Sequence, residues 1–184
     1  MKKLKLVIIF VILSFISCNK IDDNGFRVYK IKEGKHRSTL KIKYTRENSF
    51  DIQVKFNESA IYTSQSLENQ LDVNKLWGVS DCGTHHSKNS IRFGWRWDLN
   101  KEQIEILMYR RLSSEFEFKS LGHVNPGDIS YMSLNITNDH YYMSLNGVED
   151  SMSRKCYNPC RRYFLYPYFG GNEKAPHDIT IKIK

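Results

Sequence analysis

Apolar and polar residues alternate with a period of two along most of the chain from Phe26 onward. Because successive side chains of a β-strand point to opposite faces, this alternation predicts strands with one buried face. About eleven such runs follow one another at short spacing, and only residues 66–74 could form a helical turn. The predicted strands cover 26–31, 40–44, 52–56, 76–79, 91–97, 104–109, 116–121, 129–136, 141–145, 163–169 and 179–183.

Turn residues between these runs favour antiparallel pairing. Asn125-Pro126-Gly127-Asp128, Asn138-Asp139 and Asn146-Gly147 each stand between two strand patterns or at the end of one, and all tolerate tight turns. Many short strands with almost no helix between them predict an all-β fold, an antiparallel β-sandwich of jelly-roll type. Residues 26–184 are enough for one such domain with a substantial core.

The first residues have the three parts of an export signal. A basic start at Met1 to Lys5 precedes a short apolar run from Leu6 to Ile16 and the small residue Ser17. The run is shorter than the about 20 residues needed to cross a bilayer. The pattern resembles a bacterial lipobox, although Phe15 stands where Leu is usual. We therefore predict a lipoprotein signal peptide at 1–17 and lipidation of Cys18.

A polar tether, residues 18–25, follows the predicted cleavage point. Its Lys20 and the pair Asp22-Asp23 resemble the signal that sends some lipoproteins of Bacteroidota to the cell surface, and a plain linker is the alternative. The predicted location is the cell envelope. The lipid on Cys18 is expected to anchor the protein in the outer membrane, with the domain exposed at the cell surface.

The net charge of the chain excludes few classes of binding partner. The net charge is +8 for 184 residues, and it falls to +5 for the 167 residues left without 1–17, because Lys2, Lys3 and Lys5 are lost and no acid is. No basic helix or RNA-binding motif accompanies this surplus, so nucleic acid is not a predicted partner. A mild positive charge suits acidic glycans or anionic head groups, and a solvated basic surface explains it equally well.

Three cysteines remain when Cys18 is set aside, so they cannot all pair within the chain. Cys156 and Cys160 enclose the turn-forming pair Asn158-Pro159, which favours a disulfide between them in an oxidising compartment. The alternative is that Cys82 bonds one of the two and ties distant parts of the sandwich together.

The densest polar cluster, 81–89, directly precedes the strand pattern 90–97. Ile91, Phe93, Trp95 and Trp97 share one strand face, which we expect to be core, and Arg92 and Arg96 share the other. Two guanidinium groups flanking Gly94 offer fork-shaped donors to a carboxylate or sulfate. The alternative is pairing of these arginines with acids on the neighbouring strand, such as Glu105 or Glu117.

Metal and cofactor sites are not predicted. His85 and His86 could join Cys82 as zinc ligands, but neighbouring residues of an extended segment point in opposite directions, so both imidazoles do not suit one ion. Asp178 could help to hold a structural calcium ion, which takes oxygen ligands. Alternatively, Asp178 accepts backbone N–H groups where the final strand starts.

The same residues also suggest an enzymatic hypothesis, the cleavage of a polysaccharide. Cleavage of a uronic-acid polymer by elimination needs a group that neutralises the carboxylate, for which Arg92 or Asn89 is suited. It also needs a base, and His85, His86, Tyr109 and Tyr142 are the candidates. Hydrolysis needs two facing carboxyl groups, whereas Glu102 and Glu105 lie on opposite strand faces. The Glu-x-Asp-x-x-Glu motif of jelly-roll glycosidases is absent, so hydrolysis ranks below lyase chemistry.

Three motifs carry a resemblance to a known group. They are 82–86 (CGTHH), 89–95 (NSIRFGW) and the aromatic stretch 165–171 (LYPYFGG) with 175–179 (APHDI). Together they resemble motifs in a group of uncharacterised lipoproteins of Bacteroidota, over most of the domain. The resemblance implies an extracytoplasmic jelly roll similar to concanavalin-like lectin, glucanase and polysaccharide-lyase domains. That group has no established catalytic residues.

These observations favour a binding protein over an enzyme. We expect carbohydrate to lie on an exposed sheet face. A polysaccharide lyase acting on acidic glycans is the alternative, and the sequence does not decide between them. A structural or adhesive surface protein is a third hypothesis, and it predicts that no cleft gathers Arg92, His85 and the aromatic rings. The residues expected to bind the glycan are Asn89, Arg92, Arg96, Tyr166 and Tyr168.

Overall fold

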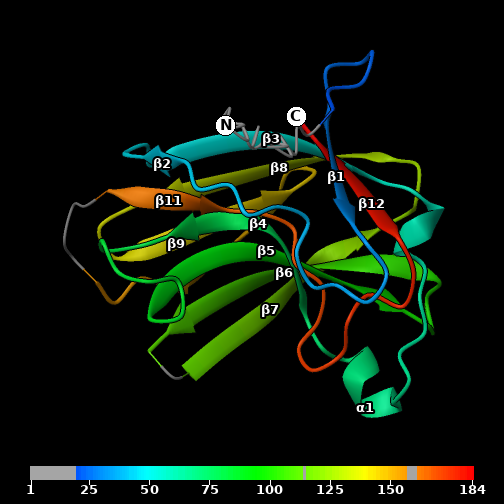
Figure 1. The fold of residues 1–184 in the computed structure, drawn as a ribbon. Coiled ribbons are helices and arrows are strands. Elements are labelled where there is room, and N and C mark those ends of the chain that lie inside the picture. The colour runs from blue at the N-terminus through cyan, green and yellow to red at the C-terminus, as the bar shows by residue number, and fades with distance from the viewer. Residues whose placement is uncertain (1–19, 114, 157–160) are drawn as a thin grey trace, which may run out of the picture.

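The computed structural model describes residues 20–113, 115–156 and 161–184, which form two six-stranded antiparallel sheets packed face to face (Figure 1). The prediction of an all-β antiparallel sandwich is confirmed. The predicted signal peptide, Cys18 and Cys160 lie outside the described residues. Within those residues, no helix is both long and apolar enough to cross a membrane.

The first sheet joins the two ends of the described chain. β1 and β12 lie side by side, blue and red in Figure 1, and β12 continues the sheet to β3. In spatial order the strands are β1 (Arg27–Ile31), β12 (Ile179–Ile183), β3 (Ser49–Phe56), β8 (Ile129–Ile136), β9 (His140–Leu145) and β10 (Val148–Ser153).

The second sheet carries the strand with the two predicted glycan-binding arginines, β5, near its middle. The loop between β3 and β4 contains a short 3-10 helix, η1 (Glu58–Ala60), and one helical turn, α1 (Leu67–Gln70), where 66–74 predicts one. In spatial order the strands are β2 (Tyr44–Thr45), β11 (Arg162–Leu165), β4 (Asn74–Ser80), β5 (Asn89–Asp98), β6 (Gln103–Leu112) and β7 (Glu115–Val124).

The core lies between the sheets and follows the predicted alternation. Ile91, Phe93 and Trp95 of β5 are fully buried, and Trp97 is nearly so. Each fully buried large apolar side chain contributes about 1.5–3 kcal/mol. The alternate residues of β5 therefore face outward, and this outer face of the second sheet is the surface available to a ligand.

Two parts of the sequence pattern are misleading. Residues 40–44 alternate like a strand, but only Tyr44 joins one, while Leu40 and Ile42 are 79% and 65% exposed. Conversely, the sequence pattern predicts no strand at β10. Met152 is the buried residue in an otherwise polar edge strand, so no alternation of apolar and polar residues marks it. The Asn146–Gly147 turn before it is confirmed: both residues have positive φ, +50° and +88°, as a tight hairpin turn requires.

Candidate functional site

A cavity of about 610 Å³ opens at the β11 end of the second sheet. One wall is the segment 37–44, another is the loop 83–86, and β11 with its continuation to Tyr168 forms a third. Arg92 also lines the cavity. Its volume falls within the range of small-molecule and sugar sites, about 300–1,000 Å³. His85, His86, Arg92, Tyr166 and Tyr168, all named from sequence, thus meet in one place.

The loop that brings His85 and His86 to the cavity is held by its own polar residues. It leaves β4 through Cys82 and Gly83, which both have positive φ. Thr84 donates its backbone N–H to the Asp81 carbonyl, and the Asn89 side chain donates to Thr84 Oγ1 at 3.0 Å. Asn89 therefore shapes the loop, and it is not among the residues that line the cavity.

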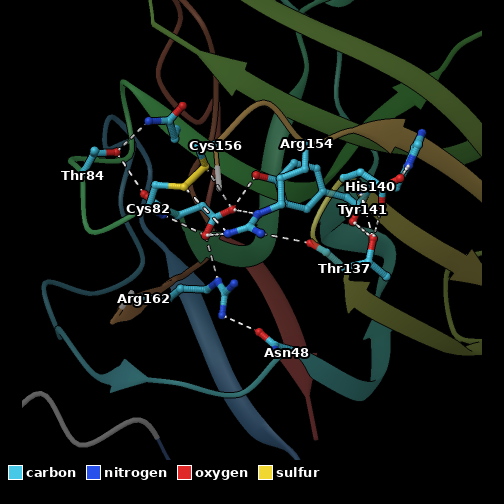
Figure 2. A network of polar contacts seen from close by, with 12 residues as sticks. Asn48, Cys82, Thr84, Thr137, His140, Tyr141, Arg154, Cys156 and Arg162 are labelled. Atoms are coloured by element: carbon cyan, nitrogen blue, oxygen red, sulfur yellow. Dashed lines mark hydrogen bonds and ion pairs between the residues drawn. A yellow bond between two sulfur atoms is a disulfide. The ribbon is translucent and has the colours of Figure 1, made fainter. Parts of the chain in front are cut away.

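Asp81 is the buried anchor of this loop, and sequence reasoning missed its role. Figure 2 shows Arg154, Arg162 and Tyr141 converging from three different strands or loops. Arg154 Nε lies 2.6 Å and Arg162 Nε 3.0 Å from the carboxylate of Asp81, and the Tyr141 hydroxyl donates to it at 2.7 Å. Burial opposes ionisation, but the hydrogen bonds from Arg154 and Tyr141 outweigh it and lower the pKa of Asp81.

A disulfide joins Cys82 to Cys156 beside this anchor (Figure 2). The expected bridge between Cys156 and Cys160 is therefore wrong, and the alternative pairing through Cys82 is confirmed. The physical reason is that the chain returns after β10 to the loop that follows β4. The Cα atoms of Cys82 and Cys156 are then 6.1 Å apart, a distance that a disulfide can span. Asp81, Cys82 and Cys156 cluster as metal ligands would, but here the sulfurs bond each other and the carboxylate accepts from arginines.

His86 is the imidazole with a defined partner at the cavity wall. Its Nδ1 lies 3.0 Å from the Tyr163 hydroxyl, which also accepts the His86 backbone N–H at 2.8 Å. Burial, reinforced by the positive charge of Arg92, lowers the pKa of His86 to about 4. The ring is therefore neutral at pH 7. His85 instead contacts the Ser87 hydroxyl, 2.7 Å away.

Arg92 has no hydrogen-bond or ion-pair partner among the described residues. Its Nε is buried and makes no hydrogen bond with any described residue. None of the ion pairs between described residues includes Arg92. Burial lowers its pKa to about 10, so the guanidinium stays charged at pH 7. An unpaired buried charge is costly, which is why most are neutralised within the fold.

Two further cations lie near Arg92 without an ion-pair partner among the described residues, and sequence reasoning did not single them out. Lys75 Nζ donates to the Gly170 carbonyl and lies 4.9 Å from the centre of the Tyr109 ring. Burial and the nearby charge of Arg92 lower the pKa of Lys75 to about 8. Within the described part of the chain, Arg111 donates only to backbone carbonyls, those of Ser87 and Ser113. No pattern in the sequence marks these two, because their proximity depends on strand register.

Other predicted site residues lie elsewhere. Arg96 pairs with Glu105 at 2.6 Å, as the structural alternative for the arginines proposes, and Arg96 does not line the cavity. Tyr109 lies opposite Arg92 on the neighbouring strand β6, just outside the cavity. Tyr142 is on β9 in the other sheet, where it packs against His140, so it is not brought to this site.

Asp178 is engaged by protein groups. It pairs with Lys30 at 2.6 Å and accepts the Glu33 backbone N–H at 2.9 Å. The second contact is the backbone role predicted as the alternative to calcium. A calcium ion would have to compete with the ammonium group of Lys30, so the donor set does not fit a calcium site.

Known structures share this architecture. The alginate lyase AlyC3 superposes with a TM-score of 0.62 at 11% identity, over 89% of this chain and 75% of the lyase. A family 16 glycoside hydrolase from Bacteroides ovatus, solved with its product, gives 0.56 at 11% identity, over 89% and 81%. An endo-1,3-beta-glucanase from Thermotoga petrophila gives 0.54 at 11% identity, over 88% and 75%.

These likenesses confirm the jelly-roll fold, and at such identities they carry no residue roles. The similar proteins are glycan-active enzymes with a concanavalin-like fold. No protein-family model matches the chain, and no curated protein matches its sequence.

Proposed function

We propose that the domain formed by residues 26–184 binds an acidic polysaccharide on the outer face of its second sheet. The observation that carries the proposal is Arg92, a charged guanidinium at a 610 Å³ cavity with no partner among the described residues. Lys75 and Arg111 add positive charge that no acid pairs with in the described chain. A carboxylate or sulfate on a sugar would supply the missing counter-charge and accept hydrogen bonds from the guanidinium fork.

The proposal agrees with what one of the similar structures binds. One of them is the alginate lyase AlyC3 in complex with dimannuronate, an acidic disaccharide. The cavity also gathers Arg92, His85 and four tyrosines, which the hypothesis of a purely structural surface protein does not predict. Acidic glycan binding accounts for both the cavity and its charge.

Binding is tested by titrating alginate, polygalacturonate, heparin and neutral laminarin into the chain without residues 1–17. We expect affinity for at least one acidic polymer and none for laminarin. Arg92→Met should weaken binding about 10–100-fold, since a hydrogen bond to a charged group contributes about 1.5–3 kcal/mol. Arg27→Met, on β1 of the other sheet, is the control and should bind normally. A folded protein that binds no acidic polymer would refute the proposal.

A second candidate function, cleavage by β-elimination, is favoured by the contact between His86 and Tyr163 next to Arg92. In that reaction Arg92 neutralises the uronate carboxylate and neutral His86 removes the adjacent C5 proton. The C4–O bond then breaks, a C4=C5 double bond forms, and the leaving oxygen takes a proton, for which the Tyr163 hydroxyl is suited. Hydrolysis fits less well, because Glu105 is tied to Arg96 and Asp98 to His123.

The ultraviolet absorbance of an unsaturated product distinguishes cleavage from binding. If the chain is a lyase, absorbance rises with alginate or polygalacturonate, and His86→Gln and Tyr163→Phe abolish the rise while both variants still bind polymer. His85→Gln is the matched control, because that ring lies beside the His86 ring and has a different partner. Binding without any absorbance change across the panel would rule out the lyase and leave the binding protein.

We also propose that the domain is exported and anchored through lipidated Cys18 to the cell envelope, at the outer membrane and facing outward. The signal-like residues 1–17, the tether 18–25 and the resemblance to Bacteroidota lipoproteins support this. Metabolic labelling with a fatty acid tests it. Label that appears on the native chain and is lost in Cys18→Ser would support the anchor, and equal labelling of both would contradict it.

A further inference from the structure

Strand β7, at the edge of the second sheet, exposes two phenylalanines beyond the cavity. Phe116 is 56% exposed and Phe118 is 42% exposed. They are two residues apart on a strand, so both lie on the outer face, the same face as Arg92 and Tyr109. Neither is among the residues that line the cavity.

The two rings form a row with Tyr109. Tyr109 and Phe116 stack with centroids 5.9 Å apart and planes 14° apart, and Phe116 and Phe118 stack at 6.3 Å and 11°. The three nearly parallel rings make a row of apolar side chains, here called the aromatic platform, in which Phe116 and Phe118 are exposed and Tyr109 is buried beside them. Sugar rings have an apolar face of C–H groups that such a surface can bury.

Arginines border the aromatic platform. Arg111 lies over Phe116 with 6.0 Å between its guanidinium carbon and the ring centre, and Arg96 lies over Phe118 at 5.8 Å. Arg111 has only backbone carbonyls as partners among the described residues. An apolar surface beside an unpaired cation suits a ligand with both an apolar face and negative groups.

The aromatic platform is continuous with the surface beside the cavity. Arg92, Tyr109 and Phe118 lie directly opposite one another on β5, β6 and β7. Neighbouring strands are about 4.8 Å apart, so the row extends about 10 Å from the strand of Arg92 to the edge of the sheet. Lys75 lies against the Tyr109 ring, which links the charged and aromatic parts.

We propose that the aromatic platform is a sugar-stacking subsite for the acidic polysaccharide whose charged group Arg92 binds. The polymer then crosses strands β5 to β7 and places further sugar rings on Phe116 and Phe118. This inference rests on the proposed binding function, and it adds a prediction of its own: affinity must rise with the length of the oligosaccharide, and the rise must depend on the two phenylalanines.

The test titrates oligomers of two to six sugars cut from alginate, polygalacturonate and heparin into the chain without residues 1–17. We expect hexamers to bind more tightly than dimers. The double variant Phe116→Ala with Phe118→Ala should lose about tenfold affinity for hexamers and less than twofold for dimers. Substitution of both by Tyr should preserve hexamer binding. Tyr131→Ala is the control, since Tyr131 is 60% exposed on β8 of the other sheet.

The outcomes separate the two proposals. If no acidic oligomer binds the native chain, both fail. Only the aromatic platform is refuted if oligomers bind the native chain, Arg92→Met weakens that binding as expected, and the double alanine variant still shows the native dependence on length. If the double variant instead changes a dimeric protein to a monomer with unaltered glycan affinity, the platform is a contact between two copies of the chain, and the inference is also overturned.

Discussion

The arginines beside the β4–β5 loop fall into two groups, a pair and a single residue, that differ in one respect. Arg154 and Arg162 are both 4% exposed and share the carboxylate of Asp81. Arg92 lines the cavity and has no counter-charge among the described residues. The charges of the first group are paired within the fold, and this pairing holds the β4–β5 loop in place. The charge of the second group is unpaired among the described residues, and an outside anion can bind there.

Removal of the shared carboxylate should produce the largest effect. Asp81→Ala leaves two buried guanidinium groups without their counter-charge, which costs about 3–5 kcal/mol in the free energy of unfolding. Urea unfolding followed by tryptophan fluorescence measures it. Asp139→Ala is the control, because Asp139 is a surface acid beside His140 and should change little. A native midpoint for Asp81→Ala would mean that the first group is not the anchor described above.

Loss of the disulfide should follow in size. Cys82 and Cys156 are 74 residues apart in sequence, and cross-links of this kind contribute about 2–4 kcal/mol. Changing both to Ser should lower the urea midpoint accordingly. Adding reductant should bring the native chain to the same midpoint and leave the double variant unaffected. A double variant that still responds to reductant would contradict this pairing.

Substitution of arginine by methionine should have opposite effects in the two groups. Arg92→Met removes a buried donor without a partner and should raise the unfolding free energy by about 1 kcal/mol. Arg162→Met breaks a buried pair and should lower it by about 3 kcal/mol. Both are measured by urea unfolding of the variants side by side. Equal losses of stability would show that Arg92 is structural after all.

The smallest effect concerns the pH dependence of binding. Lys75 has a pKa of about 8, below the ordinary 10.5, because burial and Arg92 disfavour its charge. Affinity for an acidic oligosaccharide should therefore fall about fivefold from pH 7 to pH 9.5, as a pair contributing about 1 kcal/mol is lost. Lys75→Met should bind with affinity independent of pH over this range.

Stability should follow the opposite trend over the same range. The unfolded chain holds the Lys75 proton up to a higher pH than the folded chain does, so the contribution of Lys75 to the unfolding free energy rises between pH 8 and pH 10. Above that range Tyr29 and Tyr62, whose pKa values burial raises to about 12, begin to reverse it. Binding and stability that fall together between pH 8 and pH 10 would exclude Lys75 as the cause.

The sequence predicts whatever depends on local alternation. The buried face of β5, with Phe93 and Trp95, follows from a period of two, and so does the strand count to within a few elements. Arg92 and Arg96 share the outer face, as expected, yet they differ in role. Arg96 lies opposite Glu105 and Arg92 lies opposite Tyr109. That difference depends on the register between strands, which the alternation does not specify.

Long-range contacts are the other part that sequence reasoning misses. Asp81 meets Arg154 and Arg162 only because three separate segments pack together, and the same packing selects Cys82 over Cys160 as the partner of Cys156. A turn-forming pair of residue types such as Asn158-Pro159 is visible in the sequence, whereas the return of a distant strand is not. Lys75 and Arg111 are absent from the sequence-based candidates for the same reason.

The edge position of β7 has a consequence for solubility. An unpaired strand edge with exposed phenylalanines is a template on which further chains can add and aggregate. On β7, however, Phe116 and Phe118 alternate with Glu115, Glu117 and Lys119, which are all exposed. A second strand pairing with this edge would bring its own side chains beside these charges, which disfavours the pairing of apolar strands. The same alternation that turns the rings toward the outer face therefore guards the protein against fibre formation.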